Sequence, residues 1–171
     1  MKMRFFDFEV FPHWWCCVFG DMPDDLNDIS IDLKDNFKVV TSNDFNARDN
    51  LMNMFFEEDY VLCGYNIKRY DLAIANAIYQ GFTPEQVKIV NDIIINPGCA
   101  YSTKEHIRLQ SFANKKLNGF VYQDLMDDGE GSLKEKEAVM GLNILESDVD
   151  FNKEDLTDED IADVIYYCKQ D

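Results

Sequence analysis

Basic residues, prolines and long apolar runs are all scarce in this sequence of 171 residues. Its 16 lysines and arginines stand against 33 aspartates and glutamates, so the formal net charge is −17. A negative field of this size repels phosphates and argues against nucleic-acid binding through a broadly basic surface. No apolar run is long enough to span a membrane, so we expect no membrane association.

Linkers and repeats are missing as well. The 4 prolines and 8 glycines are scattered, and no segment is repetitive or rich in serine, glycine and proline. With 46% hydrophobic residues, the chain is long enough for one well-buried domain and too short for two comfortable ones. We therefore expect residues 1–171 to form a single domain.

The five cysteines lack the C-x-x-C spacing of a zinc site, and their odd number argues against a disulfide framework. We interpret them as reduced core thiols. The apolar run at the N-terminus is interrupted by Asp7 and Glu9 and is followed by no small-residue cleavage site, so it does not fit a signal peptide. A reducing cytoplasm is the expected location.

Alternating and helical patterns predict the secondary structure. Strands are expected over residues 3–10, 14–19, 37–41, 60–65 and 120–125, and helices over 44–57, 72–81, 83–95 and 132–141, with a last helix opening at Thr157. We expect a surface loop or widened hairpin over residues 21–35, and a long loop or short arm over residues 99–119. This order predicts an α/β fold with a mixed five-stranded sheet and helices on both faces.

Trp14 and Trp15 are neighbours on the second expected strand. Because successive side chains of a strand point to opposite faces, we expect one of them in the core and the other at the surface.

Two acids stand two residues apart on the first expected strand. In Asp7-Phe8-Glu9 both carboxylates leave the same face of the strand. Like charges held this close disfavour ionisation, so the pair needs a neutralising partner.

Two later segments each add an acid. The segment from Asn66 to Asp71 runs from a strand end into a helix start, and Tyr167-x-x-x-Asp171 places a tyrosine and an acid on one helix face. Together with Asp7 and Glu9 these acids offer only hard oxygen donors. A cage built from them would hold Mg²⁺ or Mn²⁺ rather than Zn²⁺.

The three segments, in this order, resemble the Exo I, Exo II and Exo III motifs of the DEDD superfamily of 3′–5′ exonucleases. The resemblance covers nearly the whole chain. The third motif is similar to the Tyr form, because the His form would need a histidine five positions before Asp171, where this sequence has Tyr166. The resemblance implies a ribonuclease H-like fold and the removal of nucleotides from the 3′ end of DNA with two divalent metal ions.

The resemblance also implies a role for each catalytic candidate. Asp7 would bridge both metal ions, Glu9 and Asp171 would complete the first, and Asp71 would hold the second. Tyr167 would orient the attacking water.

The candidates for substrate binding are weaker. Four of them come from the motif segments and would contact sugar or base, namely Phe8, Tyr65, Asn66 and Tyr70. Four more lie in the one distinctly basic stretch and could pair with phosphates, namely Lys104, Arg108, Lys115 and Lys116.

The Tyr form is typical of exonuclease domains attached to replicative DNA polymerases, including those of bacteriophages. The resemblance therefore favours a proofreading domain excised from a longer polypeptide that also carries a polymerase domain, acting in the cytoplasm of a bacterial host. Two alternatives stay open. One is a Tyr-form ribonuclease that trims RNA, and the other is a catalytically silent module whose acidity serves as a protein-interaction or DNA-mimicking surface.

Overall fold

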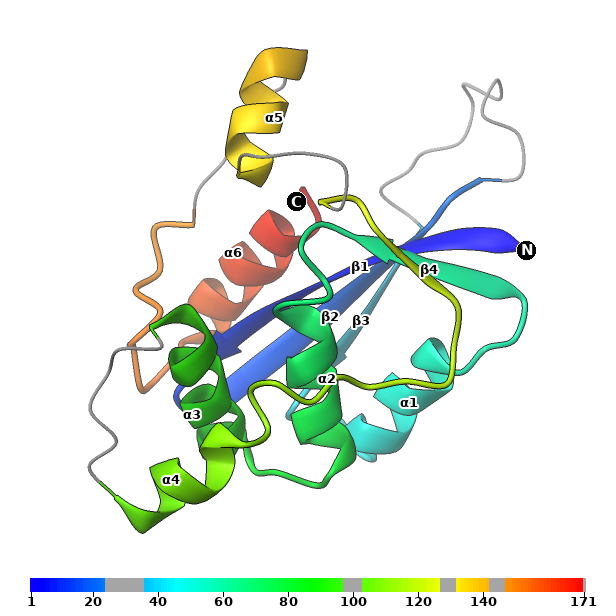
Figure 1. Cartoon of the computed structure of the whole chain (residues 1–171). Helices are drawn as coiled ribbons and strands as arrows, with labels where there is room; N and C mark the ends of the chain where they lie inside the picture. Colours follow the sequence, from blue (N-terminus) through cyan, green and yellow to red (C-terminus); the bar gives the residue numbers. More distant parts are fainter. Residues whose placement is uncertain (24–35, 97–102, 127–131, 142–146, 171) are drawn as a thin grey trace.

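The computed structural model describes residues 1–23, 36–96, 103–126, 132–141 and 147–170 (Figure 1). It shows an α/β architecture whose elements follow the chain as β1 (Lys2–Phe11), β2 (Trp14–Asp21), β3 (Phe37–Thr41), α1 (Ala47–Phe55), β4 (Tyr60–Gly64), α2 (Asp71–Tyr79), α3 (Pro84–Ile95), α4 (Lys104–Gln110), β5 (Tyr122–Asp124), α5 (Leu133–Met140) and α6 (Asp158–Cys168).

The five strands form one mixed sheet in the order β3-β2-β1-β4-β5. β1 pairs antiparallel with β2, and β2 pairs antiparallel with β3. On its other side β1 pairs parallel with β4, and β4 pairs parallel with β5. The mixed five-stranded sheet predicted from the sequence is therefore confirmed.

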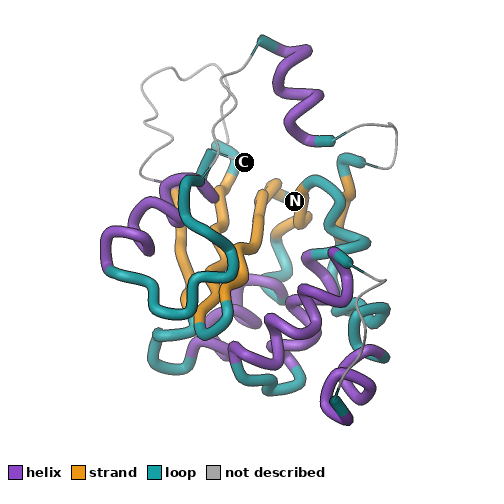
Figure 2. The backbone as a smooth tube through the Cα atoms, turned by 90° about the vertical axis from the view of Figure 1, so that its left-hand side faces the viewer, coloured by secondary structure: helices purple, strands orange, loops and turns teal. Residues whose placement is uncertain are grey.

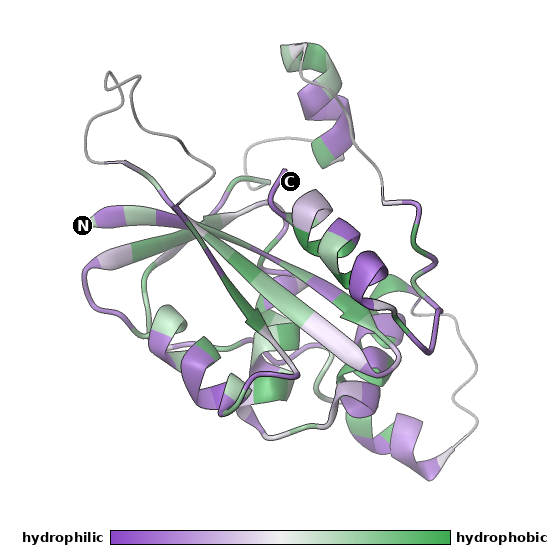
Figure 3. Cartoon of the chain, turned by 180° about the vertical axis from the view of Figure 1, so that it is seen from behind, coloured by the Kyte–Doolittle hydropathy of each residue, from purple (hydrophilic) through white to green (hydrophobic). Residues whose placement is uncertain are grey.

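Helices cover both faces of this sheet, as predicted. On one face, Trp15, Cys17 and Phe19 of β2 belong to the main core with side chains of α1, α2 and α3. On the other face, the alternate residues Cys16 and Val18 pack against α6. Figure 3, which views the molecule from behind, shows α6 lying across this second face.

This two-sided cover corrects the expectation for the two tryptophans. Trp14 and Trp15 do point to opposite faces, but both are buried, because α6 closes the face that the sequence left open to solvent. The expectation for the cysteines is confirmed where the structure describes them: Cys16, Cys17, Cys63 and Cys168 are free and buried. Cys99 lies outside the described residues.

Local hydrogen bonding explains why the helix starts could be predicted. Thr83, Ser132 and Thr157 each accept the backbone N–H three residues on, and the side chain there returns the bond. The long loop expected over residues 99–119 is wrong in part, because Thr103 caps the seven-residue helix α4. The loop or hairpin expected over residues 21–35 lies largely outside the described residues.

The two small helices stand far apart. α5 lies at one end of the molecule beside the C-terminal end of α6, and α4 lies at the opposite end, as Figures 1 and 2 show from two directions. None of the described helices is long and apolar enough to cross a membrane.

A buried arginine fixes the start of β1. The Arg4 side chain is fully buried and donates two hydrogen bonds to the Asp21 carboxylate, one of them 2.9 Å long. It also donates to Glu57 Oε2 at 2.7 Å and lies 3.6 Å from the centre of the Tyr60 ring. The charge is thus held by partners from three segments, which ties β1 to β2 and β4.

Removing one of these partners should be costly. Asp21→Ala leaves a buried guanidinium with Glu57 as its remaining carboxylate, and we expect a loss of about 2 kcal/mol or more in unfolding free energy, measured by urea denaturation. Lys38→Ala is the matched control, because Lys38 is exposed and lies 3.8 Å from the same carboxylate. Its loss should stay below about 1 kcal/mol. Equal losses for both variants would contradict a dominant role for Arg4.

Candidate functional site

The site begins where β1 and β4 separate. Parallel pairing joins Lys2–Phe5 to Tyr60–Cys63 and then stops, although β1 continues to Phe11. Glycine is needed at the end of β4, because a Cβ atom on Gly64 would lie 2.5 Å from Ile67 Cγ2 and 2.9 Å from the Phe6 carbonyl oxygen. The backbone of β1 beyond Phe6 is therefore left facing the segment that follows β4.

That segment, residues 65–70, is shaped by its own backbone. Asn66 has a φ of 61°, in the left-handed region that asparagine tolerates better than most residues. Its carbonyl oxygen accepts hydrogen bonds from the N–H groups of Arg69 at 3.1 Å and Tyr70 at 3.2 Å. The chain thereby turns directly into α2.

Asp124, at the end of β5, anchors the same segment. Its carboxylate is buried and accepts the Lys68 N–H at 2.8 Å and the Met126 N–H at 3.0 Å. Two backbone donors at a buried carboxylate are strong hydrogen bonds, so the position of the segment is set by β5 as well as by β4.

Asp71 is the first residue of α2 and is only 2% exposed. Burial and the neighbouring Asp7 carboxylate raise the pKa of Asp71 well above its ordinary value, although the backbone N–H groups of Asp71 and Phe8 favour the ionised form. Within the described residues, its Oδ1 atom is buried without a hydrogen-bond partner. The charged form of the Asp71 carboxylate is thus disfavoured by its surroundings, a condition called strain below. Asp71 lies beside the part of β1 that no longer pairs with β4.

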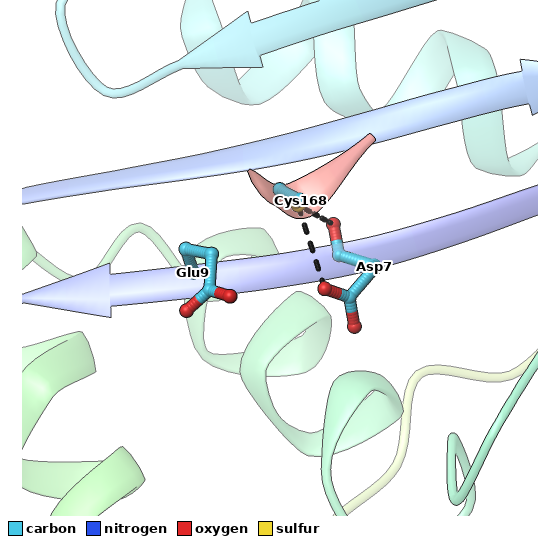
Figure 4. Close-up of side chains that lie close together, drawn as sticks. All are labelled: Asp7, Glu9 and Cys168. Carbon is cyan, nitrogen blue, oxygen red and sulfur yellow. Dashed lines mark hydrogen bonds between the residues drawn. The ribbon is translucent and has the colours of Figure 1, made fainter. Parts of the chain in front are cut away.

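Asp7 and Glu9 meet α6 on the other side of β1. One ligand atom from each of Asp7, Glu9 and Cys168 lies within 4.8 Å of the others. Figure 4 shows the two carboxylates on β1 with Cys168 above them. The thiol is 3.4 Å from Asp7 Oδ2 and 3.7 Å from the Asp7 carbonyl oxygen.

Cys168 is a protonated donor in this arrangement. Its hydrogen bond with Cys16, burial, and the neighbouring Asp7 carboxylate raise the pKa of Cys168 well above its ordinary value. A protonated thiol is a poor ligand for a hard cation, so its contact with Asp7 serves to orient the carboxylate.

Among the described residues, the remaining catalytic candidate is Tyr167 on α6. Tyr167 is half-buried near the end of this helix, next to Cys168. The ammonium of Lys134 on α5 lies 5.9 Å from the centre of its ring. Asp171, the predicted fourth ligand, lies outside the described residues.

The substrate candidates from the motif segments separate into two groups. The Phe8 ring is in the main core, in contact with Phe6 and Phe55. The Tyr70 hydroxyl donates a 2.6 Å hydrogen bond to Asn91 on α3. The Phe8 ring therefore has a packing role in the core. Tyr70 lies near the carboxylates, because burial and the charges of Asp71, Glu9 and Asp7 raise the pKa of its hydroxyl well above the ordinary value.

Tyr65 and Asn66 are better placed for substrate. Both are half-buried at the β4 end of the site. The Oδ1 atom of Asn66 is buried and has no hydrogen-bond partner among the described residues. An acceptor left in this state, close in sequence to Asp71, is suited to a ligand hydroxyl.

The basic stretch is not gathered at the carboxylates. Arg108 lies over the Phe82 ring, 5.9 Å from its centre, and Phe82 follows the end of α2 remote from Asp71. Lys104 opens α4 at the same end of the molecule, and Lys115 lies over Phe112. Lys116 is closer, because the next residue donates its N–H to the Leu72 carbonyl on α2.

Sequence reasoning assigned no role to Cys168, to Asp124 or to the two lysines of α5, Lys134 and Lys136. Cys168 stands beside Tyr167 in the sequence but looks like an ordinary apolar helix residue. Asp124 had a signal, since it closes a strand that runs into a turn. The positions of the α5 lysines depend on how this helix packs against the rest of the molecule, which no local sequence pattern predicts.

Carboxylate oxygens are the ligands that hard divalent cations prefer. Among the described residues, the group whose ligand atoms lie within 4.8 Å of one another is Asp7, Glu9 and Cys168, and Asp71 is not part of it. Asp71 is near enough for the Asp7 charge to raise its pKa, and its Oδ1 atom has no hydrogen-bond partner among the described residues. Comparison with protein-family models, with curated proteins and with solved structures gave no match for this chain. The interpretation therefore depends on the motifs and on this geometry.

The unfavourable environment of the Asp71 carboxylate should lower the free energy of unfolding. A raised folded-state pKa means that the folded protein binds the extra proton, so stability falls as the pH rises above the ordinary Asp value of 3.8 toward the folded pKa. In chelator at pH 7.5 we expect Asp71→Asn to raise the unfolding free energy by about 1 kcal/mol or more, since one pKa unit corresponds to about 1.4 kcal/mol.

The gain of Asp71→Asn should shrink toward pH 4, where the wild-type carboxyl is already protonated. Thermal and urea unfolding at both pH values measure it, with Asp148→Asn as an exposed control. A gain that is absent, or independent of pH, would show that Asp71 is not strained.

Proposed function

We propose that this chain is a metal-dependent 3′–5′ exonuclease of the DEDD superfamily in its Tyr form, with a ribonuclease H-like fold and DNA as its substrate. The observation that carries the proposal is the position of Asp71. Residues 64 positions apart, Asp7 and Asp71, come close enough for the charge of one to raise the pKa of the other. The motif resemblance predicts that these two carboxylates lie near each other, and this nearness supports the proposal.

The metal ligands proposed are Asp7, Glu9, Asp71 and Asp171. When bound, Mg²⁺ or Mn²⁺ would supply a nucleophile at neutral pH and stabilise the negative charge that develops on the leaving 3′ oxygen. The cations would also relieve the repulsion between Asp7 and Asp71. Metal binding would therefore gain free energy from the removal of this repulsion and would stabilise the folded protein.

The other residues act around these ligands. Cys168 holds the Asp7 carboxylate by a hydrogen bond. Asp124 fixes the segment that leads into Asp71. The unpaired Oδ1 atom of Asn66 would accept a hydrogen bond from the terminal sugar, and Tyr167 would orient the attacking water.

The activity can be tested with 5′-labelled single-stranded DNA and RNA oligonucleotides. We expect DNA to be shortened from its 3′ end with Mg²⁺ or Mn²⁺ and to stay intact with chelator, as gel analysis would show. Asp7→Ala should abolish the shortening, because it removes a proposed metal ligand. Preferential shortening of RNA would transfer the proposal to the ribonuclease alternative. Absence of any 3′ shortening would favour the silent acidic module.

Tyr167→Phe tests the role of the hydroxyl. We expect kcat to fall by about 10- to 100-fold with little change in KM, because a misplaced nucleophile slows the chemical step more than it weakens binding. Tyr166→Phe is the matched control, since Tyr166 is the adjacent helix residue and is 61% exposed. Equal rates for Tyr167→Phe and wild type would remove Tyr167 from the reaction.

A further inference from the structure

Capping interactions at both ends stabilise helix α5. Ser132 and Glu135 exchange hydrogen bonds in a capping box at the start, and Gly141 closes the helix with a φ of 73°. Its last apolar side chains face solvent, with Val139 88% exposed and Met140 65% exposed. A helix stabilised in this way can be held beside the site by a few side chains rather than by a packed core.

Two lysines of α5 make contact with candidate site residues. Lys134 lies 5.9 Å from the centre of the Tyr167 ring, and Lys136 lies 5.6 Å from the centre of the Tyr65 ring. Tyr167 is on α6 and Tyr65 follows β4, so the helix reaches elements on both sides of β1. Positions two apart on a helix are about 200° apart around its axis, which is why the two lysines reach different tyrosines.

Lys134 and Lys136 alternate on α5 with Glu135 and Glu137, so these lysines are distinguished by their position and not by the net charge of the helix. Among the described cations that lie over aromatic rings, Lys134 and Lys136 are the two whose rings belong to predicted site residues. The helix α4, with Lys104 and Arg108, lies at the opposite end of the molecule (Figure 1). A strand whose 3′ end reaches the carboxylates would therefore pass α5.

We propose that Lys134 and Lys136 form a phosphate clamp, which binds the backbone of single-stranded nucleic acid immediately upstream of its 3′ end. This rests on the proposed function for the location of that end. Lys134 and Lys136 are half-buried. The contact of a lysine with an aromatic ring is worth less than a charge-assisted hydrogen bond to a phosphate oxygen, so the lysines would exchange the rings for the strand. The exchange would also uncover the Tyr65 ring for stacking with a base.

The clamp is tested by binding. We would measure the affinity for fluorescein-labelled (dT)₈ by anisotropy, with Ca²⁺ as a divalent cation and at several salt concentrations. Lys134→Ala combined with Lys136→Ala should weaken binding at least about 10-fold. The slope of log affinity against log salt should fall by about 1.4, since each phosphate contact on a single strand contributes about 0.7. Lys134→Arg combined with Lys136→Arg should retain both affinity and slope.

A matched control removes two cations elsewhere. Lys38→Ala combined with Arg48→Ala takes away the same charge, and Arg48 lies 5.5 Å from the centre of the Tyr79 ring in the same kind of contact. We expect less than about a 2-fold effect, because remote surface charges are screened. A full loss in this control would mean that net charge, and not the clamp, governs binding. Thermal unfolding of each variant checks that it is folded.

The outcomes separate the clamp from the nuclease activity. If wild type shortens DNA but the double alanine variant of α5 binds as tightly as wild type, the clamp is wrong and the nuclease proposal stands. If wild type binds (dT)₈ through these lysines but never shortens DNA, the clamp stands and the nuclease proposal fails. A loss of binding confined to Lys104→Ala combined with Arg108→Ala, or no binding by wild type, would overturn the clamp.

Discussion

The early separation of β1 from β4 is the constraint on which the candidate site depends. Paired strands satisfy each other's backbone groups, so a carboxylate can reach a strand backbone only where the pairing has ended. Here pairing stops at Phe5 and Cys63, and Asp71 approaches the Phe8 N–H three residues later. Ligand sites in open α/β sheets form at such divergences, beyond the ends of parallel strands. Gly64 permits the close packing of Phe6 and Ile67 at this point, and Asp124 holds the segment that follows by a hydrogen bond from the Lys68 N–H.

Stability and proposed function oppose each other at this point. A buried carboxylate beside another carboxylate destabilises the fold, and ordinary packing would replace it with an apolar residue. The remainder of the chain tolerates the cost because the core around α2 is extensive: Leu72, Ile74, Ala75, Ala77 and Ile78 are all buried in it. A rigid, well-packed helix can hold a strained side chain at its first residue. Strain that persists on such a scaffold marks a position where a ligand can compensate.

Much of the fold could be predicted from the sequence, because the relevant signals are local. Capping boxes depend on four consecutive residues, and alternation in β1 and β2 is visible directly. The failures have non-local causes. Both tryptophans are buried because α6, some 150 residues away, packs on their strand. The Phe8 ring enters the core because Asp7 and Glu9 face the other way. For the site, alternation along β1 predicted that Asp7 and Glu9 lie on one face, whereas the thiol contact of Cys168 and the docking of α5 follow from tertiary packing alone.

The strong acidity of the chain need not prevent it from binding a polyanion, because charges act over limited distances. At physiological salt, exposed charges more than about 8–10 Å apart are largely screened. Asp158, Glu159 and Asp160 begin α6, whereas Cys168 ends it, and ten residues of helix span about 15 Å. These acids are therefore too distant to govern the site. Under the proposed function, a strand would meet there a set of carboxylates and the two lysines of α5, which alternate with Glu135 and Glu137. The net charge of −17 acts on the molecule as a whole. The side chains nearest to the candidate site would decide what binds there.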